Sequence, residues 1–349
     1  MTHSIWQYIA DEELLSELIS TFPTWSLLII IAVGVFLLSK GADLMIDGVV
    51  DLAERTGMPK VVIGATIVSL GTTMPEAFVS VLAAFQGDPG LALGNGVGSI
   101  IADTGLIFGL TALISTVPLN RYILNRNGWW QVGSATLLAV LSAFLLLLPA
   151  ERRFIGRPMG IGLLILLAVY MYMNFRWSKG HTEEEMDTNA SEYESDAPSW
   201  LCWIMIIGGI AMVIAGARLL IPAASELALR LGVPQDVIAA TMVAFGTSLP
   251  ELMTAITAVR KGHPEITVGN VVGADVLNCL FVIGAASVAR PLSVPVNFYL
   301  IHFPVMLLVL WSFRIFVSAN KGKTFPRWQG VWLLSLYLIY VIFQYTVLA

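Results

Sequence analysis

Apolar residues run along this chain for about twenty positions at a time, and polar residues collect in short stretches between these runs. A helix needs about 20 such residues to cross a bilayer, so each run predicts one membrane span. WSLLIIIAVGVFLL (25–38) and TLLAVLSAFLLLLP (136–149) are two examples. The spans are predicted near residues 25–50, 60–86, 90–116, 128–149, 157–177, 200–229, 235–260, 265–289, 296–318 and 329–348. Composition agrees with a polytopic membrane protein, because 57% of the 349 residues are hydrophobic and only 12% are charged.

The polar stretches divide the chain and indicate its orientation. The acidic stretch 178–199 has no apolar periodicity, so we expect a solvated linker there. It separates a first five-helix unit (25–177) from a second one (200–349), and residues 1–24 precede both. Odd-numbered loops carry twelve Lys and Arg residues, whereas the even-numbered loops and both termini together carry five. By the positive-inside rule the linker is cytoplasmic, and both termini, including 1–24, face the extracellular or periplasmic side.

A sequence repeat relates the two units. A shift of 175 residues aligns 62–114 with 237–289 without a gap, and 17 of the 53 positions are identical. The identical positions include Gly, Thr, Pro, Glu and Asn, which chance matching of apolar segments does not produce. Five spans per unit is an odd number, so the second copy enters the membrane in the opposite orientation. Inverted repeats that meet near the midplane are a recurring architecture of secondary transporters.

The most informative repeated motif places a glutamate beside a proline inside an apolar span. GTTMPE (71–76) is matched by GTSLPE (246–251). Proline removes the hydrogen bond to the carbonyl four residues earlier and kinks the helix. We therefore expect free carbonyls, including that of Gly71, next to Glu76 and Glu251. Hydroxyl groups surround these positions, namely those of Ser69, Thr72, Thr73, Ser80, Thr247 and Ser248.

The following span of each unit adds further oxygen donors. One helix stripe carries Asn95, Ser99 and Asp103, and the matching stripe carries Asn270, Ala274 and Asn278. The inverted symmetry predicts one site near the midplane, framed by Glu76, Glu251, Asp103 and Asn278. Carboxylate, carbonyl and hydroxyl oxygens are hard ligands that suit Na⁺, Ca²⁺ or Mg²⁺.

A membrane carboxylate can instead be a structural partner of a buried cation, and Lys40 and Arg218 are the two candidates. Two glutamates that are related by a repeat, each beside a helix-breaking proline, favour the functional interpretation. Asp43, Asp47 and Glu226 lie toward the ends of their spans, so we expect them to pair or to reach the interface.

The paired motifs GT(T/S)(M/L)PE and GN-x-VG(S/A) resemble the two alpha repeats of prokaryotic sodium/calcium exchangers, within the calcium/cation antiporter superfamily. The resemblance is close over 62–114 and 237–289, and the ten-span plan extends it to nearly the whole chain. It implies an all-α membrane protein of ten helices in two inverted-topology five-helix repeats, with helices 2, 3, 7 and 8 broken around a midplane cation site. It also implies a secondary active antiporter, not an enzyme, that exchanges Ca²⁺ for Na⁺ by alternating access in a prokaryotic inner membrane.

The resemblance assigns individual ligands. Glu76 and Glu251 are the central ion ligands, joined for calcium by the backbone carbonyls of Thr72 and Thr247. Flanking sodium sites would use Thr73, Ser248, Ser99 and the backbone at Ser69 and Ala244. The chain departs from the family at four positions: Ala274 replaces a serine, Asp103 and Asn278 are interchanged, and Asp275 replaces a common asparagine.

Charge arithmetic sets one further expectation. Glu76, Glu251 and Asp103 together carry one negative charge more than a single Ca²⁺ neutralises. We therefore expect Asp103 to be protonated when calcium is bound.

Several alternatives stay open on the sequence. An H⁺/Ca²⁺ antiporter or an exchanger of Mg²⁺ or Mn²⁺ would use the same fold, and the departures at Asp103 and Ala274 favour proton coupling. An intramembrane aspartyl protease would use Asp103 and Asp275, but it would leave the paired glutamates unexplained. Ca²⁺ and Na⁺ are expected as transported ions and the lipid bilayer as the partner; the sequence indicates no organic cofactor, nucleic acid or obligatory protein partner.

Overall fold

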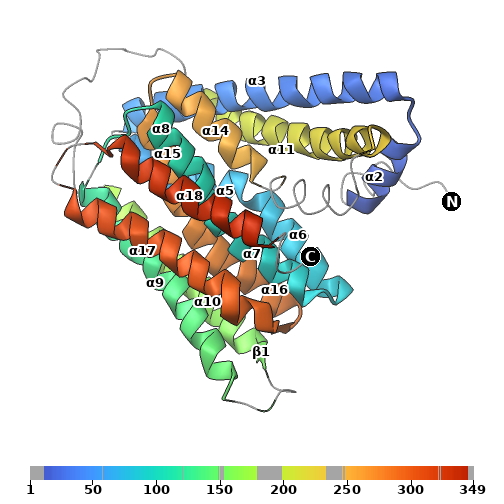
Figure 1. Cartoon of the computed structure of the whole chain (residues 1–349). Coiled ribbons are helices and arrows are strands. Elements are labelled where there is room, and N and C mark those ends of the chain that lie inside the picture. The colour runs from blue at the N-terminus through green and yellow to red at the C-terminus, as the bar shows by residue number, and fades with distance from the viewer. Residues whose placement is uncertain are drawn as a thin grey trace.

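The first apolar run folds into α3 (Thr24–Thr56) in the computed structural model, and this helix packs along α11 (Ser199–Arg230). Figure 1 shows the two helices side by side along one edge of the molecule. The short helix α2 (Glu12–Ser20) precedes α3 and contacts α11. The structure describes residues 12–56, 58–119, 121–147, 149, 153–178, 199–232, 246, 248–320, 322 and 324–344.

Glycines bring α3 and α11 into backbone contact. A Cβ atom on Gly34 would lie 3.0 Å from the carbonyl oxygen of Gly216, and one on Gly41 would lie 2.8 Å from that of Gly209. Gly48 faces Cys202 in the same way. Residue numbers rise along one helix as they fall along the other, so the pair is antiparallel. Small residues allow this close approach, which is how helices in lipid gain packing contacts.

Gly209→Ala is expected to destabilise the protein by about 1–3 kcal/mol, because overpacking a tight contact forces the backbones apart. The added Cβ would lie 2.6 Å from the Gly41 carbonyl oxygen and 2.6 Å from the Met45 backbone nitrogen. Gly208→Ala on the same helix is the matched control, since its Cβ would meet only a Leu44 methyl group at 3.8 Å. Thermal unfolding in detergent measures both variants. Equal melting temperatures for the two would contradict this account of the interface.

The remaining apolar runs form a second group of helices beside the α3–α11 pair (Figure 1). Most of the large buried hydrophobic cluster lies within it. Its members are α7 (Pro89–Ala102), η2 (Asp103–Phe108), α8 (Gly109–Ile114), α9 (Arg121–Leu145), α10 (Arg157–Ser178), α15 (Pro264–Leu277), η6 (Asn278–Val282), α16 (Ile283–Ala289), η7 (Phe298–His302), α17 (Phe303–Ala319) and α18 (Arg327–Phe343). The η segments are π-helical turns. Strands β1 (Phe154–Ile155) and β2 (Leu292–Ser293) pair antiparallel in the connections outside the spans, which the sequence did not predict.

The second predicted span is bent at its proline. It consists of α4 (Lys60–Ile63), η1 (Gly64–Val68) and α5 (Ser69–Thr72), followed after Thr73 by α6 (Met74–Gln86). The two halves meet at 42°. Proline stands within the first two positions of α6, and again within those of α14 (Leu249–Arg260), where its missing N–H breaks no helical bond. The break expected near residue 73 is therefore confirmed.

The third and eighth predicted spans differ from the expectation of broken helices. Residues 89–114 and 264–289 each form one helix long enough to cross a membrane, and a π-helical turn lies within each in place of a break. Such turns widen a helix by one residue without interrupting it, and they are frequent at functional sites.

The described helices make the chain a polytopic membrane protein. Seven of them are long and apolar enough to span a bilayer, and the bent pair 60–86 makes an eighth. Helix α18 is shorter, at 17 residues. The first part of the span predicted over 235–260 and most of the linker 178–199 lie outside the described residues. The count of ten spans and the domain division stay predictions.

Candidate functional site

Glu76 and Glu251 occupy equivalent positions in the structure. Each lies in the first turn of its helix, α6 or α14, directly after the proline. Each is buried, with 1% of its surface exposed. The first turn of a helix favours negative charge, because its backbone N–H groups point outward there. The bend at Thr73 therefore gives a buried carboxylate a favourable electrostatic position within an apolar span.

Asp103 and Asn278 also occupy equivalent positions. Asp103 is the first residue of the π-helical turn η2, and Asn278 is the first residue of η6. Both side chains are buried. The wider turn lets a side chain leave the stripe that an unbroken α-helix would impose.

The four framing residues leave many polar atoms without hydrogen bonds. Buried polar atoms in proteins nearly always have a partner, so such a concentration points to bound cations or water. Among the described residues, no hydrogen bond reaches either carboxylate oxygen of Glu76, Glu251 or Asp103, either amide atom of Asn278, or the hydroxyls of Thr73, Ser99 and Ser248. Apart from the Asn278 Nδ2 nitrogen, these atoms are hard oxygen donors of the kind that the sequence predicted.

The structure brings the two halves of the site together. Glu76 lies close enough to Glu251 and Asp103 for their charges to interact. The Thr72 side chain of the first half lies beside Glu251, and Ser248 of the second half lies beside Asp103. Each half thus supplies groups to a carboxylate of the other.

Other contacts hold the site in shape. The Thr72 hydroxyl donates to Oδ1 of Asn270 at 3.3 Å, which joins α5 to α15. Nδ2 of Asn95 donates to the backbone carbonyl of Glu76 at 3.0 Å and to the hydroxyl of Ser80 at 2.9 Å. The Asn95 amide therefore fixes the first turn of α6, a role that its place on the polar stripe did not reveal.

The carbonyls of Gly71 and Thr72 near the break lack helical hydrogen bonds. The Gly71 carbonyl, which the proline was expected to free, is approached by the Thr73 N–H, but that N–H makes its hydrogen bond to the Ser69 carbonyl. Among the cap and loop hydrogen bonds of the described residues, none ends on the carbonyl of Thr72. The Ser69 carbonyl accepts from the Thr73 N–H at 2.9 Å. Thr247 and Ala244 lie outside the described residues.

Three carboxylates outside the site pair with cations, as expected. Asp47 pairs with Lys261 at 2.5 Å, Glu226 with Arg230 at 2.8 Å, and Asp43 with Lys40 at 3.8 Å. The Arg218 guanidinium lies over the ring of Phe78. The candidate structural partners of the buried glutamates, Lys40 and Arg218, therefore make contacts elsewhere.

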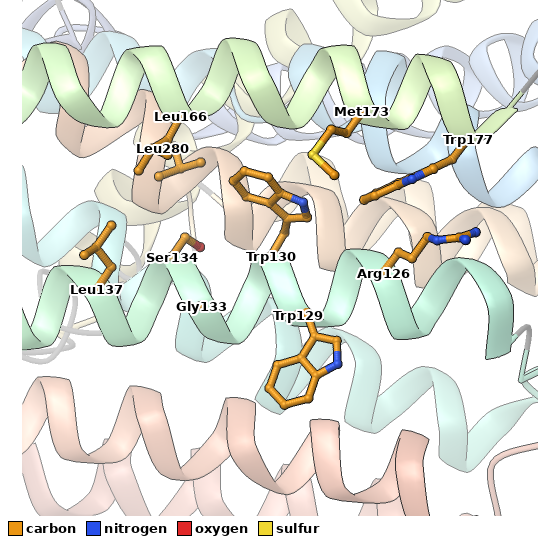
Figure 2. Close-up of a pocket in the computed structure, with 10 residues that line it drawn as sticks. All are labelled: Arg126, Trp129, Trp130, Gly133, Ser134, Leu137, Leu166, Met173, Trp177 and Leu280. Carbon is orange, nitrogen blue, oxygen red and sulfur yellow. The ribbon is translucent and has the colours of Figure 1, made fainter.

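A pocket of about 440 Å³ lies between α9 and α10, away from these oxygens. Figure 2 shows Trp130 and Trp177 turned into this space, with Met173 beside them and Arg126 at one end. No carboxylate lines the pocket. It is therefore not the cation site.

Sequence reasoning missed two residues beside the site. Gln131 of α9 and Thr104 of η2 are fully buried, and both donate hydrogen bonds to Asp275. The available signal was a glutamine within an apolar span, because an amide there needs a polar partner.

Comparisons with known proteins agree with this geometry. The family model described as sodium/calcium exchanger protein matches residues 26–176 and 201–346. An uncharacterized membrane protein of Methanocaldococcus jannaschii is 31% identical over 311 residues, covering 88% of this chain and 94% of that protein. The sodium/calcium exchanger MaX1 of Methanosarcina acetivorans is 30% identical over 342 residues, covering 90% and 97%. A structure of the sodium-calcium exchanger NCX_Mj soaked with Na⁺ and Sr²⁺ superposes with a TM-score of 0.76 at 28% identity, covering 90% and 97%.

Proposed function

We propose that this chain, which belongs to the sodium/calcium exchanger family, exchanges Na⁺ for Ca²⁺ across a membrane. One observation carries the proposal. Glu76 and Glu251 are buried side by side in the first turns of α6 and α14, and their oxygens accept no hydrogen bond from the described residues. A pair of buried anions with unsatisfied oxygens is stable only when cations neutralise it.

Each proposed ligand follows from its chemistry. Two glutamates match the charge of Ca²⁺, and the backbone carbonyls of Thr72 and Thr247 complete an oxygen shell around it. Sodium, which carries one charge, is held by fewer carboxylates and more neutral oxygens. We assign to its sites Thr73, Ser248, Ser99 and the backbone at Ser69 and Ala244, and Asp103 and Asn278 frame the centre together with the two glutamates. Because the two sets share the glutamates, Na⁺ and Ca²⁺ compete, and competition is what an antiporter requires.

Alternating access is proposed through two inverted repeats. Gly34 and Gly41 correspond to Gly209 and Gly216 under the 175-residue shift. Gly34 contacts Gly216, which is the counterpart of Gly41, and Gly41 contacts Gly209, which is the counterpart of Gly34. This exchange of partners supports a two-fold relation between residues 25–177 and 200–349. We propose that α3 and α11 slide against the remaining helices and open the site to one side at a time.

The orientation follows from the Lys and Arg distribution. Both termini, including residues 1–24, then face outward, and the linker 178–199 is cytoplasmic. A prokaryotic inner membrane is the proposed location.

Calcium-45 uptake into proteoliposomes tests the exchange directly. An outward sodium gradient is compared with an outward proton gradient, and Glu251→Gln provides the blank. Uptake driven by sodium is the expected result. Uptake driven only by protons would replace the proposal with an H⁺/Ca²⁺ antiporter, which the missing hydroxyl at Ala274 and the closeness of Asp103 to Asp275 favour. No uptake under either gradient would exclude calcium and direct the assay to Mg²⁺ and Mn²⁺.

Asp103→Asn is expected to retain calcium transport, with a rate within about tenfold of the unaltered protein. An asparagine keeps the shape and the oxygen of a protonated Asp103, and the two glutamates still match the charge of Ca²⁺. The initial rate of calcium-45 uptake at saturating sodium measures the effect. Near-complete loss of transport together with weakened calcium binding would show that the Asp103 carboxylate is charged in the calcium-bound state.

A further inference from the structure

A fourth buried carboxylate lies next to the proposed site and has no part in the mechanism above. Asp275 of α15 is 1% exposed, and its Oδ2 atom accepts two hydrogen bonds. The hydroxyl of Thr104 is one donor, and Nε2 of Gln131 is the other at 2.5 Å. Gln131 also approaches Thr104 directly, at 3.2 Å. Three separate elements, α15, η2 and α9, therefore converge on one carboxylate oxygen.

The other oxygen of this carboxylate is available. Oδ1 of Asp275 is buried and accepts no hydrogen bond from the described residues, and the same is true of Oε1 of Gln131. Because two donors converge on Oδ2, the plane of the carboxylate is fixed and so is the direction of Oδ1. Hydrogen bonds of this kind stabilise a carboxylate as an anion. An anion that is buried with one unsatisfied oxygen needs a cation.

Asp103 lies near Asp275. It precedes Thr104 in the chain, its charge interacts with that of Asp275, and both of its oxygens lack hydrogen bonds from the described residues. The charge of Asp103 therefore interacts with Glu251 of the central site as well as with Asp275. Two carboxylates with neutral oxygens beside them form a hard donor set.

The arrangement belongs to one half of the protein only. Under the 175-residue shift Asp275 corresponds to Ile100, and Thr104 corresponds to Cys279. The repeated motifs therefore do not account for it.

We propose that Asp275 and Asp103 bind an additional sodium ion beside the Glu76/Glu251 centre, and that Thr104 and Gln131 are positioning residues for Asp275. A monovalent cation fits because Asp103 is shared with the central site, so that little more than one negative charge belongs to the new subsite. This subsite rests on the proposed function, because it adds one sodium ion to the proposed exchange. It predicts that the protein binds one sodium ion more than the central and flanking ligands would hold.

Sodium binding to the purified protein gives the sharpest test. Asp275→Asn keeps an oxygen acceptor for Thr104 and Gln131 and removes only the charge. The number of sodium-22 ions bound per chain is expected to fall by one, and the Hill coefficient for sodium in calcium-45 uptake is expected to fall with it. The half-saturating sodium concentration should rise about tenfold or more. Asp43→Asn is the matched control, because it removes a carboxylate that pairs with Lys40 outside the site.

The positioning residues give an independent readout. Thr104→Val removes one donor and leaves the charge of Asp275, so it should weaken sodium binding without changing the number of ions bound. Thr104→Ser restores the hydroxyl and should restore the affinity, a rescue that a purely structural role would not require. These two variants also test the proposal if Asp275→Asn does not fold.

An unchanged number of bound sodium ions and an unchanged Hill coefficient in Asp275→Asn would overturn the subsite. Failure of the exchange proposal is a separate outcome, because it shows as absent sodium-driven calcium uptake by the unaltered protein. The sodium-22 measurement does not depend on calcium transport and decides the subsite in either case.

Discussion

Glu251→Gln is expected to abolish sodium-driven calcium uptake and to weaken calcium binding at least about 30-fold. Removing one partner from a buried set of charges costs about 2–5 kcal/mol, and every 1.4 kcal/mol is a factor of ten in affinity. Glutamine keeps the length of the side chain, yet it loses the charge and one of the two oxygens that can coordinate Ca²⁺ together. The same result is expected for Glu76→Gln, since Glu76 has the equivalent position in α6.

Calcium-45 uptake and isothermal titration with calcium measure these losses, and Glu265→Gln is the matched control. Glu265 lies in the first turn of α15 and faces His263 at 3.3 Å, outside the site. Its amide variant should transport normally. Normal transport by Glu251→Gln would remove the basis of the proposed site, whereas equal losses in all three variants would point to a general folding defect.

Gly269→Ala is expected to lower transport about tenfold or more and to destabilise the fold, because it separates α15 from the bent span. A Cβ at this position would overlap the carbonyl oxygen of Val61 and lie 3.0 Å from the backbone nitrogen of Ala65. Both atoms are backbone, so neither can turn aside. Overpacking of this kind costs about 1–3 kcal/mol or more. It also displaces the contact between Thr72 and Asn270, and a shift of about 1 Å in a functional site can cost a factor of 10² in rate.

The control for this variant is Gly133→Ala on α9, whose Cβ would meet no atom of the described residues within 4 Å. Melting temperature and calcium-45 uptake are measured for both variants. An unchanged melting temperature in Gly269→Ala would mean that α15 and the bent span separate without loss of stability. The close backbone contact would then not hold the site together.

The helices and the paired glutamates could be predicted because both depend on local sequence. Long apolar runs decide the spans, and Pro75 and Pro250 each stand at the start of a helix with a carboxylate in its first turn. The 175-residue repeat then predicted that Glu76 and Glu251 meet, and their charges do interact in the structure.

The remaining features depend on contacts between distant segments, which no local pattern specifies. Asp275 and Gln131 stand 144 positions apart, and only the packing of α9 against α15 brings them together. The π-helical turns at Asp103 and Asn278 were expected as helix breaks, because glycine-rich sequence is compatible with either.

The glycines of α3 recur every seven residues, at 34, 41 and 48, and two of the three glycines of α11, at 209 and 216, are also seven residues apart. Seven residues correspond to about 10.5 Å of helix at a rise of 1.5 Å per residue. A displacement by that length would bring Gly41 opposite Gly216 and Gly48 opposite Gly209, which would give the interface a second register with glycine facing glycine. Between the two registers, larger side chains would face the glycines and push the helices apart. The barrier between the two registers would therefore hold α3 and α11 together, so that the pair moves as one unit against the remaining helices.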